Sequence, residues 1–248
     1  MQEALDAAPQ SWTLSLLPKT LGALPGYAVA LRGISQWEDF FATLPRSLRR
    51  NLRRDFKRLS ALGRIEIGWS ATVEDANAVL TWLFAHKRQW SQSHGFNTQY
   101  LKDDRLKDFF IALADRTDLS TVPLVSFVKV DGVPVAAAVS LVSKSCVEGF
   151  FTTYDEAFRL YSVGTLLVEF LVKWAHANKL DFDFRPLDGD YKAIWANQKS
   201  SHKTRIIFLS ARGRLAEFSL FGALASRGWT KLRKIPASIF ERARARVA

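Results

Sequence analysis

Apolar residues in the first half of the chain recur at the spacing of an α-helix. Steps of three and four residues place successive side chains on one helical face. This spacing predicts helices at residues 46–59, 73–94 and 104–116. A short apolar segment at residues 64–69 is typical of a β-strand. The first half of the chain is therefore expected to be mainly helical.

In the middle of the chain the apolar residues alternate with a period of two, which is the pattern of half-buried strands. We expect three strands, at residues 122–130, 133–142 and 147–153. The dipeptide Asp131-Gly132 separates the first two, and Asp-Gly is a strong signal for a two-residue hairpin turn. The three strands are therefore expected to form an antiparallel meander.

Helical and strand patterns alternate after the meander. We expect a helix at 163–177, a buried strand at 180–184, a short helix at 191–197 and a last strand at 204–210. Helices followed by a meander and then by alternating elements predict an α+β (layered α/β) fold. Its central sheet is expected to be mostly antiparallel, with flanking helices.

The first predicted helix has one apolar stripe and is basic elsewhere. The stripe that we expect to pack on the core consists of Leu48, Leu52, Phe56 and Leu59. Ser47 is expected to cap the start of this helix, and Gly63 its end. The remaining faces carry arginine and lysine, so we expect them to face water.

Charge is concentrated in two segments of the 248-residue chain, whose formal net charge is +11. Residues 45–58 hold seven Lys or Arg and one acidic residue, and residues 227–248 hold the same numbers. Such segments favour a polyanionic partner, namely cofactor phosphates, nucleic acid or an anionic membrane face. A mere solvated helix face explains residues 46–58 equally well.

Several classes of protein are disfavoured by the sequence. Cys146 is the only cysteine, which excludes an internal disulfide, and we expect it to be an inert residue of a strand. The four histidines lack the spacing of a zinc site, so no metal is expected. No apolar run approaches the ~20 residues that cross a bilayer. Residues 1–10 lack the pattern of a secretory signal, so a cytoplasmic protein is expected.

Two junctions between predicted elements could carry chemistry. Residues 161–167 start a helix directly after the meander, where unpaired N–H groups can bind phosphate and Gly164 permits close approach. An ordinary helix start explains this segment as well. Residues 181–192 hold four Asp, Arg185 and Lys192 just after a buried strand. A carboxylate there can act as a general base, but Asp190 could equally cap the following helix.

Three features together resemble the acetyltransferase-like domain of the CelD/BcsL group. They are the basic helix at 47–54 leading to Gly63, the Tyr-Ser-x-Gly-Thr-Leu-Leu turn at 161–167, and Phe182-Asp-Phe followed by Tyr191-Lys192 and Trp195. That group belongs to the broad GNAT-like superfamily and is related to the FemABX peptidyltransferases. The similarity extends approximately over residues 45–210.

The resemblance implies a GNAT-like acyltransferase fold in which two splayed central strands admit the pantetheine arm of acyl-CoA. It implies direct attack of an amine or hydroxyl on the thioester, while a backbone N–H polarises the carbonyl. The acceptor would be a small sugar or amino-acid-type molecule, in exopolysaccharide or envelope metabolism. On this basis residues 1–44 are an N-terminal segment, the remnant of a first lobe, 45–212 the acyltransferase domain and 213–248 a basic helical extension.

The resemblance also assigns roles to individual residues. The donor, acyl-CoA or acetyl-CoA, is expected to contact Phe151, Thr152, Thr153, Tyr161, Ser162, Val163, Gly164 and Thr165. The expected catalytic residues are Asp183, Asp190, Tyr191 and Lys192. The expected substrate-binding residues are Arg50, Arg54, Arg185 and Trp195. Tyr161 and Leu166 depart from the usual GNAT phosphate loop, so the sequence does not fix acetyl-CoA as the donor.

Two alternatives remain open from the sequence. One is a Fem-like transferase that takes an aminoacyl group from charged tRNA, with the basic helix at 46–58 contacting the phosphates. The other is a non-catalytic module that binds nucleic acid, or makes peripheral contact with a membrane surface, through the two basic segments. Salt dependence separates the tRNA-dependent enzyme from a CoA-dependent one.

Overall fold

The computed structural model describes residues 23–95, 99–186 and 189–203. Residues 23–202 form one compact unit built on a seven-stranded sheet. The strands are β1 (Ala23–Val29), β2 (Ile65–Trp69), β3 (Val125–Val130), β4 (Val133–Val142), β5 (Cys146–Tyr154), β6 (Asp181–Asp183) and β7 (Gln198–Lys203). The helices are α3 (Trp37–Thr43), α4 (Arg46–Ser60), α5 (Val73–Ser93), α6 (Arg105–Asp115), α7 (Val163–Ala177) and α8 (Asp190–Trp195), with short 3₁₀ helices η1 (Gln99–Leu101) and η2 (Glu156–Tyr161).

The sheet has the order β2-β3-β4-β5-β6-β1-β7. Four neighbouring pairs, β2–β3, β3–β4, β4–β5 and β1–β6, are antiparallel, whereas β5 and β6 run parallel. The predicted α+β fold with a mostly antiparallel sheet is thus confirmed. The predicted hairpin is confirmed too, because Asp131 and Gly132 have φ values of 49° and 81°, as the tight turn requires.

The two parallel strands stay together over only part of their length. β6 pairs with Cys146, Val147 and Glu148 at the start of β5. The rest of β5 pairs with β4 alone, and a register irregularity at Val139/Ser140 accompanies the change. Among the described residues, the second half of β5 therefore has a free edge on the side where β6 has ended.

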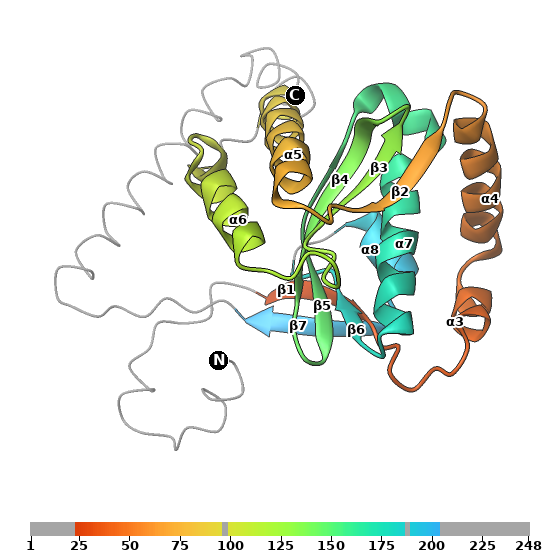
Figure 1. The fold of residues 1–248 in the computed structure, drawn as a ribbon. Helices are drawn as coiled ribbons and strands as arrows, with labels where there is room; N and C mark the ends of the chain where they lie inside the picture. The colour runs from red at the N-terminus through yellow and green to blue at the C-terminus, as the bar shows by residue number, and fades with distance from the viewer. Residues whose placement is uncertain (1–22, 96–98, 187–188, 204–248) are drawn as a thin grey trace, which may run out of the picture. The chain divides into compact units, whose positions relative to one another are not determined.

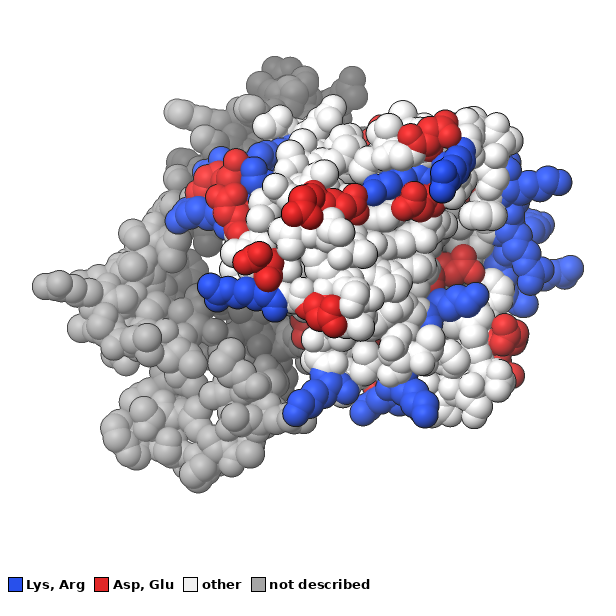
Figure 2. Space-filling model, in the orientation of Figure 1, with Lys and Arg blue, Asp and Glu red and all other residues white. Residues whose placement is uncertain are grey.

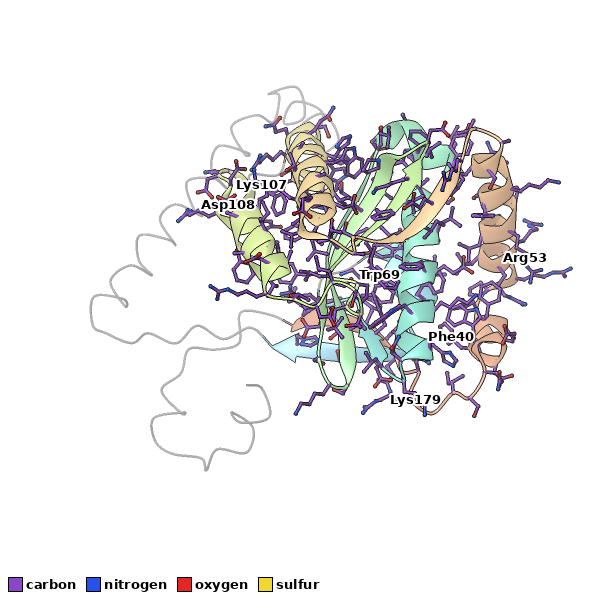
Figure 3. All side chains as sticks on the ribbon, in the orientation of Figure 1. Phe40, Arg53, Trp69, Lys107, Asp108 and Lys179 are labelled. Carbon is purple, nitrogen blue, oxygen red and sulfur yellow. The ribbon has the colours of Figure 1, made fainter. Side chains whose placement is uncertain are left out.

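Helices cover both faces of the sheet, as Figure 1 shows. On one face α5 and α6 bury Phe84 and Phe110 against Phe127 and Phe151. On the other face α7 packs on the strands, with α3 and α4 outside it, and Phe40 lies fully buried between them (Figure 3). The period-two pattern of β3 and β4 supplies alternate residues to these two cores, which is why both faces are apolar.

The helix α4 differs in detail from its prediction. Leu52 and Leu59 are buried, but Phe56 is 45% exposed, and the polar Asp55 is buried instead. The helix begins at Arg46 after Pro45 and ends before Ala61, so the predicted caps Ser47 and Gly63 were wrong. Gly63 has another role, since a Cβ there would collide with the carboxylate of Asp131. Side-chain partners outside α4, which the sequence does not show, decide these positions.

Other predictions can be compared with the structure only in part. The strand at 180–184 and the helix at 191–197 appear as β6 and α8. The predicted strand at 204–210 and the extension at 213–248 lie outside the described residues. β1, α3 and β7 were not predicted, and β1 and α3 place residues 23–43 in the same compact unit as the rest. Within the described part, no helix is both long and apolar enough to span a bilayer.

Candidate functional site

A cavity of about 560 Å³ lies beside the free edge of β5. Its walls come from α5, β5, η2, the start of α7 and α8. The lining residues are Lys87, Trp90, Thr152, Thr153, Tyr154, Arg159, Ser162, Val163, Gly164, Thr165, Val168 and Tyr191. The volume lies within the range of ~300–1,000 Å³ that is usual for small-molecule sites. The cavity is therefore large enough for an extended cofactor arm.

The first turn of α7 forms one wall of the cavity. Val163 and Gly164 stand where a helix leaves its backbone N–H groups unpaired and where the helix dipole is positive. The backbone of Gly164 passes so close to Tyr154 that an added Cβ would lie 3.4 Å from the ring. Gly164 is half-buried and has no side chain, so a ligand can approach its backbone closely, and this helix start suits the oxygens of a phosphate group.

The opposite wall is the free edge of β5, and Lys87 reaches it from α5. Its Nζ donates a hydrogen bond of 3.1 Å to the carbonyl oxygen of Thr152 and lies 4.4 Å from the centre of the Trp90 ring. The Thr152 carbonyl must therefore point away from β4. Since the N–H and C=O of one strand residue point to the same side, the Thr152 N–H also faces the cavity.

The cavity is electrostatically one-sided. Lys87 and Arg159 line it, and none of the described lining residues is acidic. Burial lowers the pKa of Lys87, because no carboxylate compensates the lost hydration of its ammonium. A cavity with uncompensated positive charge and free N–H groups is suited to an anionic ligand.

Two phenols line the same cavity, and both keep their protons at neutral pH. Burial is the main cause that raises the pKa of Tyr154, with the charge of Glu156 adding to it. Burial also raises the pKa of Tyr191, whose ring meets Phe184 edge-on at 5.9 Å. The Tyr154 hydroxyl is hydrogen-bonded to Glu156, whereas the Tyr191 hydroxyl can donate a proton or a hydrogen bond to a ligand.

Seven of the residues predicted from the sequence meet at this cavity. They are Thr152, Thr153, Ser162, Val163, Gly164, Thr165 and Tyr191. The first six come from the predicted donor set, and Tyr191 from the predicted catalytic set. The structure thus brings together two segments of chain that the sequence analysis had placed in one site.

Other predicted site residues lie elsewhere. Phe151 and Trp195 are 8% and 1% exposed and belong to the two apolar cores. Tyr161 lies outside the cavity, and the guanidinium of Arg58 stacks over its ring at 5.2 Å. Arg50 and Arg54 are exposed on α4. These five side chains therefore do not line the cavity.

Three of the four remaining predicted residues, Asp183, Arg185 and Lys192, form a local network that begins at the end of β6. An Asp183 oxygen accepts the N–H of Arg185 at 2.6 Å, and Lys192 donates to the Arg185 carbonyl oxygen at 3.3 Å. The Arg185 guanidinium stacks on Phe150 at 4.1 Å, and its backbone is left-handed, with φ 64°. Asp190 is exposed at the start of α8. The network links the end of β6 to α8, the helix that carries Tyr191.

Sequence reasoning missed Lys87, Trp90, Tyr154 and Arg159. Lys87 and Trp90 lie three residues apart on α5, so they share one helical face, and this spacing was the available signal. Tyr154 and Arg159 lie in the connection from β5 to α7. Only the packing of α5 against β5 shows that these residues share a cavity.

The model of the acetyltransferase (GNAT) domain matches residues 46–193. This match covers more than half of the chain. The chain belongs to the acetyltransferase (GNAT) domain family. The matched residues include α4, α5, β5, the first turn of α7 and Tyr191, so they contain every described residue that lines the cavity. The GNAT domain thus has its cavity where the two parallel strands separate.

Three solved structures are similar to this chain at low sequence identity. The C-terminal DUF2156 domain of a protein described as a lysylphosphatidylglycerol synthetase from Agrobacterium fabrum is 14% identical, with a TM-score of 0.50, covering 79% of this chain and 64% of that one. A conserved protein of unknown function from Bacteroides thetaiotaomicron is 13% identical, with a TM-score of 0.46 and coverages of 76% and 64%. FemX is 12% identical, with a TM-score of 0.38 and coverages of 71% and 59%.

This GNAT domain thus spans less than two thirds of the length of the solved structures that it matches. No curated protein sequence matches the chain.

Two other kinds of site, a metal centre and a nucleophilic thiol, can be compared with the described residues. No group of three or more His, Cys, Asp or Glu side chains there is arranged to hold a metal ion. Cys146 is half-buried in β5, as a strand residue, and burial together with nearby carboxylates raises its pKa to about 11. Its thiol is therefore protonated at neutral pH and is a poor nucleophile.

Proposed function

We propose that this GNAT domain transfers an acyl group from acyl-CoA to an amine or hydroxyl of a sugar or amino-acid-type acceptor. The observation that carries the proposal is the cavity between the free edge of β5 and the first turn of α7. It combines unpaired N–H groups, two cations and no acidic residue in its described lining. These are the features that a pyrophosphate with an extended amide arm requires.

The donor is proposed to lie along β5. Its pyrophosphate contacts the N–H groups of Val163 and Gly164, with Arg159 alongside. Its amide arm follows the free edge of β5, where the N–H and C=O of Thr152 face the cavity. The contacts to both parts come from backbone groups, so a departure such as Tyr161 from the usual loop sequence does not prevent binding.

The proposed chemistry is a direct transfer. The acceptor nitrogen or oxygen attacks the thioester carbon, and the carbon–sulfur bond breaks as the new bond forms. The proton that the acceptor loses in this step restores the Tyr191 phenol, directly or through water, after the phenol has given its own proton to the sulfur. A backbone N–H at the β5 edge polarises the carbonyl, and the phenol of Tyr191 protonates the leaving thiolate. Tyr191 fits this role because it lines the cavity and its phenol carries a proton at neutral pH.

We assign Asp183 and Lys192 a positioning role in this reaction. Both bind the backbone of Arg185, one at its N–H and one at its carbonyl oxygen. These bonds hold the left-handed turn from which the chain continues to Tyr191. Loss of either side chain is therefore expected to disturb transfer without direct contact with the reacting atoms.

A thermal-shift panel with CoA, acetyl-CoA, longer acyl-CoAs and tRNA tests the proposal. A ligand that binds only the folded state raises the melting temperature as its concentration exceeds Kd. Stabilisation by the CoA species alone supports the proposal. A folded protein that responds to none of them at millimolar concentration contradicts it.

A second candidate function is transfer from aminoacyl-tRNA, favoured by the outer face of α4. Figure 2 shows Lys and Arg side chains gathered on this helix at the edge of the view, and in Figure 3 Arg53 points away from the core. Three of these residues, Arg50, Arg53 and Lys57, form no ion pair with any other described residue. A phosphate backbone could neutralise these exposed charges.

Salt dependence decides between the two candidates. Each neutralised phosphate releases counterions, so three phosphate contacts from Arg50, Arg53 and Lys57 should weaken tRNA binding about 40-fold between 50 and 200 mM salt. CoA binding relies on fewer contacts and should change far less. Stabilisation by tRNA alone, lost at the higher salt, would establish the second candidate instead of the first.

A further inference from the structure

The backbone of Ser162, directly before α7, has a left-handed conformation. Its φ of 51° and ψ of 35° lie in a region that side chains other than those of Gly, Asn and Asp rarely adopt. A residue at this position commonly caps the helix with its side chain, but Ser162 makes no such bond. Its hydroxyl donates instead to an Asp55 carboxylate oxygen on α4, at 2.8 Å.

Asp55 is buried to an extent that is unusual for a carboxylate. Its side chain is 1% exposed and accepts a hydrogen bond of 2.8 Å from Nε of Arg54. Burial alone would raise the pKa of Asp55, but the hydrogen bonds from Arg54 and Ser162 outweigh it and lower the pKa. The group is thus an ionised acceptor at neutral pH, and such an acceptor makes strong hydrogen bonds.

A second contact from α4 holds the same turn. Arg58 donates a hydrogen bond of 3.1 Å to the carbonyl oxygen of Leu160, and its guanidinium lies over the ring of Tyr161. Leu160, Tyr161 and Ser162 are therefore all fixed from α4. They lead directly into Val163 and Gly164, the cavity residues whose N–H groups stand free at the helix start.

We propose that Asp55 is a positioning residue of the donor site, because it holds Ser162 in the left-handed conformation that directs the first turn of α7 into the cavity. Asp55 lies 107 residues from Ser162 in the chain and does not line the cavity. It acts on the ligand only through the turn. The inference rests on the proposed binding of a phosphate group by that turn.

If Asp55 only linked α4 to the core, its substitution would have a different effect on ligand binding. Glycine adopts the left-handed conformation without support, so Ser162→Gly frees the turn from its dependence on Asp55. If Asp55 positions the turn, Asp55→Asn should weaken ligand binding in the wild-type background but not in the Ser162→Gly background. A structural link would weaken binding equally in both.

The experiment measures the Kd for CoA by calorimetry in the full chain, for Asp55→Asn, Ser162→Gly and the double variant. We expect Asp55→Asn to raise Kd about tenfold in the wild-type background but less than about twofold in the Ser162→Gly background, whatever change Ser162→Gly itself causes, so that the double variant matches Ser162→Gly. Unchanged binding by Asp55→Asn, or additive losses in the double variant, would overturn the inference. Asp39→Asn, an exposed acid on α3, is the matched control.

Hydrogen–deuterium exchange of the peptide covering residues 160–167 separates this inference from the proposed function. Asp55→Asn should speed exchange in this peptide at least fivefold while peptides from β3 and β4 stay unchanged, and Asp39→Asn should alter neither. This result needs no ligand. Failure of wild-type protein to bind CoA would contradict the proposed function alone, whereas equal exchange rates would overturn the role of Asp55.

Discussion

The chain that follows β5 and the chain that follows β6 contribute to the cavity in different ways. After β5, the cavity is lined by four consecutive residues, Ser162 to Thr165, at the start of α7. After β6, the path from Phe184 to Lys192 provides Tyr191 as its one lining residue among those described. Under the proposed function, binding of the donor here depends on backbone geometry, whereas proton transfer depends on a single side chain.

The same contrast appears in how each segment is held. The turn before α7 is fixed from outside by α4, through Asp55 and Arg58. The loop after β6 is held by its own residues, since Asp183 and Lys192 both bind the Arg185 backbone. Substitutions in the first segment should therefore change ligand affinity, and substitutions in the second should change the rate of transfer.

Removal of the Tyr191 hydroxyl should have the largest effect. We expect Tyr191→Phe to lower kcat about 100-fold, the usual contribution of a proton donor, with KM for acyl-CoA changed little. The raised pKa of Tyr191 means that wild-type activity persists above the ordinary tyrosine pKa of about 10 before it falls. Steady-state kinetics from pH 6 to 11 check both points. Wild-type kcat in Tyr191→Phe, or the same loss in Tyr154→Phe, would contradict the assignment.

A side chain added at Gly164 should weaken the binding of CoA and leave the rate of transfer by the ligand-bound enzyme unchanged. Gly164→Val places a Cβ 3.4 Å from the Tyr154 ring and branches into the cavity beside the free N–H groups. We expect Kd for CoA to rise about 30-fold, equivalent to ~2 kcal/mol. Gly33→Val is the matched control, because a Cβ there meets nothing within 4 Å. Equal CoA titrations for the two folded variants would contradict the backbone account.

Lys87→Met should weaken the binding of CoA and stabilise the folded state. The loss of a cation that faces an anionic ligand should raise Kd for CoA about fivefold. The pKa of Lys87 is lowered, so its charge destabilises the folded state at neutral pH, and this penalty disappears as pH rises towards the ordinary lysine pKa of about 10.4. Melting curves should show the variant as more stable at pH 7, with the difference closing near pH 10. The exposed Lys173→Met should show neither effect.

The smallest effect is expected for Asp190, although it precedes Tyr191 directly. Its side chain is exposed at the first position of α8 and does not line the cavity. Asp190→Asn should therefore leave kcat/KM within about twofold of wild type, as surface substitutions usually do. A loss of more than tenfold in a folded variant would show that the loop after β6 carries a second reacting group.

The sequence predicted those parts of the fold that local patterns determine. The meander, its Asp131-Gly132 turn and the long helices α5 and α7 follow from spacing within each segment. β1 was missed because Pro25 and Gly26 within it are turn signals. Its place in the sheet depends on pairing with β6, more than 150 residues away.

For the candidate site, too, the sequence revealed the residues that are contiguous in the chain and missed those that only the fold brings together. Residues 162–165 are contiguous, so a motif reveals them together. Lys87 lies next to Arg88 on α5 and looks like part of a solvated basic face. Only the hydrogen bond from Lys87 to the carbonyl oxygen of Thr152, 65 residues later in the chain, shows where the Lys87 side chain lies. Asp55 likewise stands among arginines, and only its contact with Ser162 explains why it is buried.

A crystal structure of the full chain with CoA tests the central claim most directly. We predict the pyrophosphate within hydrogen-bonding distance of the N–H groups of Val163 and Gly164, and the pantetheine arm along β5 at Thr152. CoA bound elsewhere, for example along the outer face of α4, or an empty cavity at saturating CoA would contradict the account.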